Sequence, residues 1–195
     1  MGMGTARKQA TYDDVLAAPP HKVAEILSGD LVLSPRPGGP HAAAVSAIGE
    51  ELGPPFKRGR GGPGGWILLF EPELHLGGDI LVPDLGGWRR TTMDRVGDVP
   101  YFETRPDWVC EVLSPATERI DRAHKLPIYA REGVEHAWLV NPRQQTLEVL
   151  RREGGHWLTV ATFEGNDPVR AEPFDAIELE LGILWADVDL DTPGP

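Results

Sequence analysis

The chain has a single cysteine, little positive charge and no long apolar run. Cys110 stands alone among 195 residues, which excludes an internal disulfide and a cysteine-based zinc site. No apolar stretch approaches the roughly 20 residues of a membrane span, and the N-terminus lacks the apolar segment of a signal peptide. We therefore expect a soluble, cytoplasmic protein with no membrane partner. Cys110 lies inside an apolar run, which predicts a buried, unreactive thiol.

Positive charge is scarce, because 19 Lys and Arg residues stand against 30 Asp and Glu residues, for a formal net charge of −11. An acidic surface repels phosphate backbones, which argues against tight, non-specific nucleic-acid binding by the monomer. A local basic groove is still compatible with this balance, and residues 57–60 and 89–90 are the basic clusters available for one. Each cluster, taken alone, is more typical of solvated loop charge.

Glycine and proline are abundant, with 23 and 19 residues. They cluster at 34–40, 53–65, 77–87 and the last few positions, which predicts connecting loops rather than a disordered protein. The length and the 41% apolar content suit one folded domain. We predict this domain over residues 11–187, with a flexible lead over 1–10 and a flexible tail over 188–195.

Apolar patterning predicts a β-rich chain with two principal helices. The first runs from His41 to Leu52 and is ended by Gly53-Pro54-Pro55; the second runs from Thr117 to about Arg131, with Pro127 as a fault and Gly133 as its terminator. A short helix over 12–16 and a helical turn within 91–100 complete the helical predictions. Strands are predicted in a hairpin over 22–33 and at 66–70, 73–76, 80–85, 108–113, 136–140, 146–151 and 157–163.

Two of these apolar runs each carry one carboxylate. Asp84 follows Pro83, and a proline in a strand indicates an edge or a bulge. Glu111 is the one charged interior residue of 108–113, a run apolar enough for a strand buried on both faces. A buried ionised carboxylate is costly unless it is paired, hydrogen-bonded or bound to a metal. Two of them on neighbouring strands suggest a cation site, since Mg²⁺ prefers oxygen ligands.

The second principal helix offers a lysine to this pair. Asp121 and Lys125 are i and i+4, so they share one face of the helix. If that face packs over the strand ends, Lys125 can stabilise charge in a phosphoryl-transfer transition state. Spacing alone slightly favours a plainer alternative, in which Asp84 caps a loop, Glu111 pairs with an arginine, and Asp121–Lys125 is a surface ion pair.

Several segments resemble the restriction-endonuclease-like Uma-two family of the PD-(D/E)XK nuclease superfamily. The segments are 82–84 (VPD), 111–117 (EVLSPAT), 121–130 (DRAHKLPIYA) and 133–142 (GVEHAWLVNP). Further likeness over 25–32 and in the closing strands extends the match to roughly residues 12–185. The resemblance implies an α/β (α+β) fold, with a mixed restriction-endonuclease-like β-sheet flanked by helices and additional N-terminal and C-terminal β-hairpins.

The resemblance also implies the site. Asp84 and Glu111 would be metal ligands, Lys125 the catalytic lysine, and Glu25 a further acidic member. The superfamily expects its lysine two residues after Glu111, where this chain has Leu113. The family is similar in carrying the lysine on the following helix. A hairpin glutamate that faces solvent is an equally good interpretation of Glu25.

The function implied is Mg²⁺-dependent hydrolysis of DNA phosphodiester bonds by a homodimer, with Mn²⁺ as a possible substitute. The alternative is a catalytically inactive nuclease-fold module that binds nucleic acid or a protein partner, which the acidic charge and Leu113 favour. Weaker candidates for the site are His41, whose more typical role is structural, Glu71 and Glu73, for which we expect solvent-facing positions, and Ser114, which suits a capping role.

Overall fold

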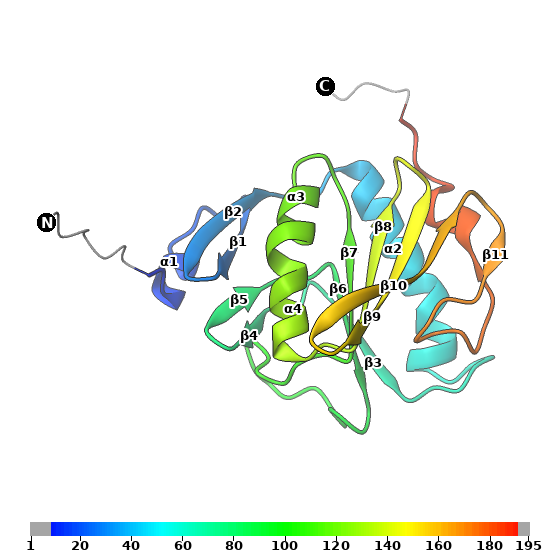
Figure 1. Ribbon diagram of the computed structural model, residues 1–195, viewed down its shortest axis with the longest axis horizontal. Helices are drawn as coiled ribbons and strands as arrows, with labels where there is room; N and C mark the ends of the chain where they lie inside the picture. Colours follow the sequence, from blue (N-terminus) through cyan, green and yellow to red (C-terminus); the bar gives the residue numbers. More distant parts are fainter. Residues whose placement is uncertain (1–8, 191–195) are drawn as a thin grey trace, which may run out of the picture.

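The computed structural model describes residues 9–190, so residues 1–8 of the predicted lead and 191–195 of the predicted tail lie outside it. The body is a six-stranded sheet with the order β10 (His156–Glu164), β9 (Thr146–Glu153), β8 (His136–Asn141), β7 (Trp108–Val112), β6 (Leu85–Arg89) and β3 (Trp66–Phe70). A four-stranded sheet stands beside it, in the order β2 (Asp30–Pro35), β1 (Lys22–Leu27), β5 (Asp79–Leu81) and β4 (Leu74–Leu76) (Figure 1). The short pair β11 (Pro168–Val169) and β12 (Leu179–Glu180) lies near the C-terminus.

The large sheet is antiparallel except between β7 and β8, which run parallel. Parallel neighbours need a crossover connection, usually helical. The predicted second helix supplies it as three consecutive segments, α3 (Glu118–Ile120), the π-helical η2 (Asp121–Lys125) and α4 (Leu126–Glu132). The fault predicted at Pro127 therefore lies one turn earlier, because the wide π turn precedes the proline that lacks an N–H. Gly133 ends the helix in the left-handed region, at φ 86°, as predicted.

The remaining helices are α1 (Tyr12–Leu16), α2 (Gly39–Leu52), the π-helical η1 (Gly53–Lys57) and the 3-10 helix η3 (Leu181–Trp185). Three predictions need correction here. Helix α2 begins two residues before His41, and the prolines after Gly53 do not end the helical path but open η1. Proline is tolerated at the first positions of a helical segment, where its missing N–H would have no partner. Residues 91–100 form turns and bends instead of the predicted helical turn.

Asp84 lies at a crossing between the two sheets. The single strand predicted over 80–85 is two strands, since β5 ends at Leu81 in the small sheet and β6 begins at Leu85 in the large one. Residues 82–84 make the passage between them, with Pro83 in the middle, where no ladder hydrogen bond is required. Pro83 is therefore neither a bulge nor an edge of a continuous strand.

The core fills both faces of the large sheet, because successive side chains of β7 point to opposite faces. Trp108, Cys110 and Val112 pack with α2, and Val109 packs with α4 on the other face. Cys110 is fully buried, as predicted. None of the helices within residues 9–190 has the length and apolar character needed to cross a membrane.

Candidate active site

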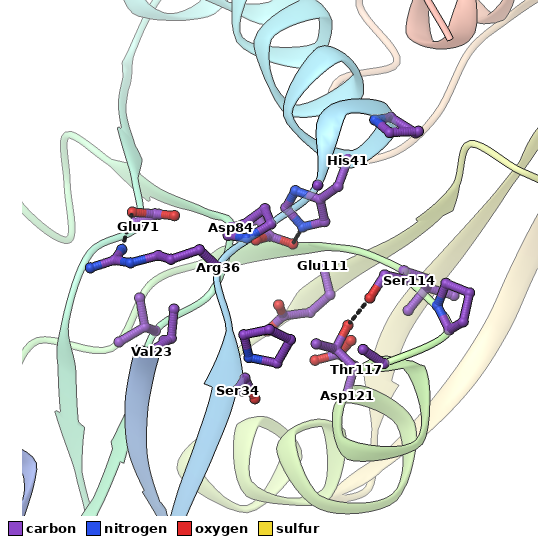
Figure 2. Close-up of a pocket in the computed structure, with 18 of the residues that line it drawn as sticks. Val23, Ser34, Arg36, His41, Glu71, Asp84, Glu111, Ser114, Thr117 and Asp121 are labelled. Atoms are coloured by element: carbon purple, nitrogen blue, oxygen red, sulfur yellow. Dashed lines mark hydrogen bonds and ion pairs between the residues drawn. The ribbon is translucent and has the colours of Figure 1, made fainter. Parts of the chain in front are cut away.

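A cavity of about 350 Å³ lies beside residues 82–84, the segment that crosses from the small sheet to the large one (the crossing segment). The four residues predicted for the site, Asp84, Glu111, Lys125 and Glu25, all line it. They come from the crossing segment, β7, η2 and β1. The β6–β7 register pairs Leu85 with Cys110, so Asp84 and Glu111 lie next to this pair on two neighbouring segments of the chain. Figure 2 shows both carboxylates facing the space that Asp121 also faces.

The ammonium of Lys125 lies among three carboxylates. Its Nζ is 2.9 Å from Glu111 Oε1, 3.3 Å from Glu25 Oε1 and 3.6 Å from Asp121 Oδ1, and it donates a hydrogen bond of 3.1 Å to the carbonyl of Val82. Lys125 is only 4% exposed. A buried ion pair of this kind is costly to form and very costly to break, because either partner alone would be an uncompensated buried charge.

These contacts exclude parts of the plainer alternative that spacing slightly favoured. Asp121 and Lys125 do share a helix face, but both are buried, so they are not a surface ion pair. Glu111 pairs with a lysine rather than an arginine. Glu25 is 3% exposed and accepts a hydrogen bond of 2.8 Å from the Val82 N–H, so it does not face solvent.

Burial and the attraction between opposite charges act in opposite directions on the pKa values of Glu111 and Lys125. Burial raises the pKa of Glu111 well above its usual value, Lys125 lowers it, and the neighbouring carboxylates raise it again. For Lys125, burial lowers the pKa, but attraction to Glu111 and then to Glu25 outweighs it, so the pKa is raised well above the usual value. The attraction to these carboxylates therefore favours the charged form of Lys125.

Tyr129 is a member of the site that the sequence reasoning missed. It is fully buried and donates a hydrogen bond of 2.7 Å from its hydroxyl to Glu111 Oε1. Burial, followed by the charge of Glu111, raises the pKa of this phenol well above its usual value. The available signal was its spacing, since Tyr129 lies four residues after Lys125 on the same helical path.

Asp84 is held through one of its oxygens. Its Oδ2 accepts a hydrogen bond of 2.6 Å from the Val112 N–H and lies 3.0 Å from His41 Nε2. The contact between His41 and Asp84 is drawn in Figure 2. His41, one of the weaker candidates from the sequence, therefore lies in the cavity wall. His41 precedes Ala44 and Ile48 at spacings of three and seven, and this helical pattern is the signal for its buried face.

Of the other weaker candidates, Glu71 and Ser114 line the cavity and Glu73 does not. Glu71 lines the cavity and faces Arg36 at 3.8 Å, whereas Glu73 contacts His75 at 2.8 Å and is not part of the lining. Ser114 lines the cavity and its Oγ lies 3.0 Å from Thr117 Oγ1. Arg36 on the cavity wall was not singled out by the sequence reasoning.

The donor set of the cavity suits a hard cation. Within residues 9–190, no group of three or more His, Cys, Asp or Glu side chains is arranged to hold a metal ion. Mg²⁺ does not need such a cage, because it is commonly bound by one or two carboxylates while water and substrate oxygens complete its coordination. Asp84 and Glu111 present that kind of pair, and the cavity beside them leaves room for the remaining ligands.

The burial of Asp121 leads to a prediction about how the stability of the protein depends on pH. Burial raises its pKa to about 6, although Lys125 lowers it. The folded state thus binds this proton more tightly than the unfolded chain does, so the stability it contributes is lost as the pH rises from about 4 to about 6. Asn at 121 cannot ionise, so we expect the stability of Asp121→Asn relative to the wild type to grow by about 1.5 kcal/mol between pH 5 and pH 7.5.

Urea unfolding of both proteins at the two pH values measures this difference. The exposed Asp98→Asn variant is the matched control and should show no such change with pH. An identical stability difference between Asp121→Asn and the wild type at both pH values would show that Asp121 is ionised equally in the folded and unfolded states.

Comparison with known proteins identifies the class of this fold. It matches a crystal structure described as "a putative nuclease belonging to DUF820" from Anabaena variabilis ATCC 29413, with a TM-score of 0.69 and 23% sequence identity over 91% of this chain and 98% of that one. Residues 10–183 match the model of the Uma2 (Uma-two) family, described as "Putative restriction endonuclease". The chain belongs to this family. No curated protein matches. The predicted family and fold are confirmed, and the family's description supports a nuclease.

Proposed function

We propose that this protein is a metal-dependent endonuclease that hydrolyses DNA phosphodiester bonds, with Asp84 and Glu111 as ligands of Mg²⁺ or Mn²⁺. The observation that carries the proposal is that Asp84, Glu111, Glu25 and Lys125, drawn from four separate segments, line one cavity. Charged groups whose pKa values are shifted by burial and by their neighbours, as those of Glu111, Asp121 and Lys125 are, are typical of functional sites. The family to which the chain belongs supports the same chemistry.

The side chains have distinct roles in this proposal. A bound Mg²⁺ supplies Lewis acidity toward a phosphate oxygen and lowers the pKa of coordinated water. Lys125 stabilises the negative charge that develops on the phosphate oxygens, since its raised pKa keeps it cationic. Glu25 fixes the crossing segment through the Val82 N–H and contributes the fourth charge of the site.

The position of the lysine fits this role despite Leu113. Leu113 lines the cavity as an apolar residue at the place where the superfamily expects lysine. Lys125 reaches Glu111 from the crossover helix at 2.9 Å, so the ammonium and the second carboxylate are adjacent. The π turn at Asp121–Lys125 belongs to the same segment, and such turns often occur at functional sites.

Asp84→Asn tests the proposal directly. The amide keeps the size of the side chain but removes the charge that attracts a divalent cation, so we expect cleavage of supercoiled plasmid DNA in Mg²⁺ or Mn²⁺ to fall by about a hundredfold. Asp98→Asn, at an exposed position, should cleave like the wild type. Thermal unfolding checks that both variants are folded. Equal cleavage by Asp84→Asn and wild type would contradict the proposed role of Asp84 as a metal ligand.

A second candidate function is a nuclease-fold module that binds nucleic acid or a protein without cutting. The observation that favours it is the position of Lys125, whose ammonium already lies among Glu25, Glu111 and Asp121. Calorimetry distinguishes the two candidates, because nucleic-acid binding without any Mg²⁺ or Mn²⁺ binding would support the module. The predicted homodimer and cytoplasmic location remain part of the proposal, and light scattering measures the former.

A further inference from the structure

We propose that His41 is a positioning residue that orients the Asp84 carboxylate toward the metal, an inference that rests on the proposed metal-dependent activity. Its Nε2 is 3.0 Å from Asp84 Oδ2, and the residue is 9% exposed. Figure 2 shows the imidazole extending from the start of α2 to the carboxylate. The residue touches a proposed metal ligand and acts through it.

Only one of the two carboxylate oxygens of Asp84, Oδ2, is engaged by the described residues. Oδ2 takes both the contact from His41 on α2 and the hydrogen bond from the Val112 N–H on β7. Among residues 9–190, no hydrogen bond engages Oδ1. Two donors from separate elements fix the plane of a carboxylate better than one, so the second oxygen keeps a defined direction for coordination.

The imidazole has no other directional partner in the described chain. An ionised carboxylate only accepts hydrogen bonds, so the hydrogen is assigned to Nε2. His41 Nδ1 is buried and has no hydrogen-bond partner among the residues described. Leaving a buried ring nitrogen unpaired costs stability, which a purely packing residue at this position would avoid. The contact with Asp84 is the interaction that accounts for a histidine here.

A rigid element carries the imidazole. Helix α2 is 14 residues long and packs on the sheet through Ala44, Ile48 and Leu52, all of which have no exposed surface. His41 continues this buried face at the end nearest Asp84. Side chains that hold a metal ligand in this way typically change metal affinity by about 10- to 100-fold when they are replaced.

Two amide variants separate positioning from packing. In His41→Gln the amide nitrogen has the reach of Nε2, whereas in His41→Asn it reaches only as far as Nδ1, which faces no partner. We expect Mn²⁺ binding by the full-length protein, measured by calorimetry, to weaken about 10- to 100-fold in His41→Asn and to stay close to wild type in His41→Gln. His41→Leu, which suits the apolar face, should lose affinity like Asn and serves if Asn does not fold.

His156→Asn is the matched control, because His156 is the exposed first residue of β10 and its replacement should leave Mn²⁺ affinity unchanged. Thermal unfolding in EDTA should be similar for His41→Gln and His41→Asn. Equal Mn²⁺ affinity in Asn, Gln and wild type would overturn the positioning role, and so would equal weakening in both variants. A wild-type protein that binds no Mn²⁺ would instead overturn the proposed function, and the role of His41 with it.

Discussion

Lys125→Met is expected to lower the free energy of unfolding by about 3–5 kcal/mol and to abolish cleavage. The substitution keeps most of the apolar length of the side chain but removes the ammonium that faces three carboxylates. Glu111 and Glu25 would then be buried like charges without a counter-ion, and both are nearly inaccessible to water. The loss is large because the partners left behind cannot be rehydrated in place.

Chemical unfolding at pH 7.5 measures this effect against a matched control. Lys57→Met removes the same charge at an exposed position, where only a hydrogen bond to the Leu68 carbonyl is lost, and should lower the free energy of unfolding by about 1 kcal/mol or less. The double variant Lys125→Met/Glu111→Gln should recover part of the lost stability, because it removes one of the stranded charges, while cleavage stays absent. A Lys125→Met variant as stable as Lys57→Met would mean that the carboxylates are already neutral in the folded protein.

Phe174→Ala is expected to lower the free energy of unfolding by about 3–5 kcal/mol. The side chain is 2% exposed and packs against four other rings. Its ring centroid lies 4.7 Å from that of Phe56, 4.9 Å from those of Trp66 and Trp108, and 5.5 Å from that of Trp138. Alanine would open a large cavity and remove these ring contacts, which contribute beyond the area they bury.

Phe70→Ala provides the comparison. Phe70 is 54% exposed and its ring lies against Gly49 of α2, so its loss should cost about 1 kcal/mol or less. Guanidinium unfolding of the two variants reports both values. A Phe174→Ala loss no greater than that of Phe70→Ala would indicate that the segment between β11 and β12 folds independently of the sheet.

Much of the fold follows from local sequence pattern. The strand at 108–113 was predicted as buried on both faces, and β7 is fully buried. Two apolar runs separated by turn residues likewise predicted the hairpin of β1 and β2. The errors lie where local pattern and long-range pairing conflict. Residues 80–85 look like one strand, but pairing with two different sheets divides them at Pro83.

For the candidate site, the sequence singled out the charged residues but not their partners. Asp84 and Glu111 attract attention because each is a charge within an apolar run, and Lys125 because it shares a helix face with Asp121. The partners that hold these residues were not predictable in this way. Tyr129 and His41 lie on helices whose buried faces are visible in the sequence, but the pattern does not say which carboxylate each face meets.

The sequence by itself placed Asp84 and Glu111 within apolar runs, because apolar periodicity defines the inner face of each strand and helix. It left open whether Glu25, Asp121 and Lys125 are buried. Only the tertiary structure decided that Lys125 lies among three carboxylates and that His41 contacts Asp84. Those contacts join residues up to 100 positions apart, between Glu25 and Lys125. They depend on how the two sheets and the crossover helix pack together, which local preferences along the chain do not specify.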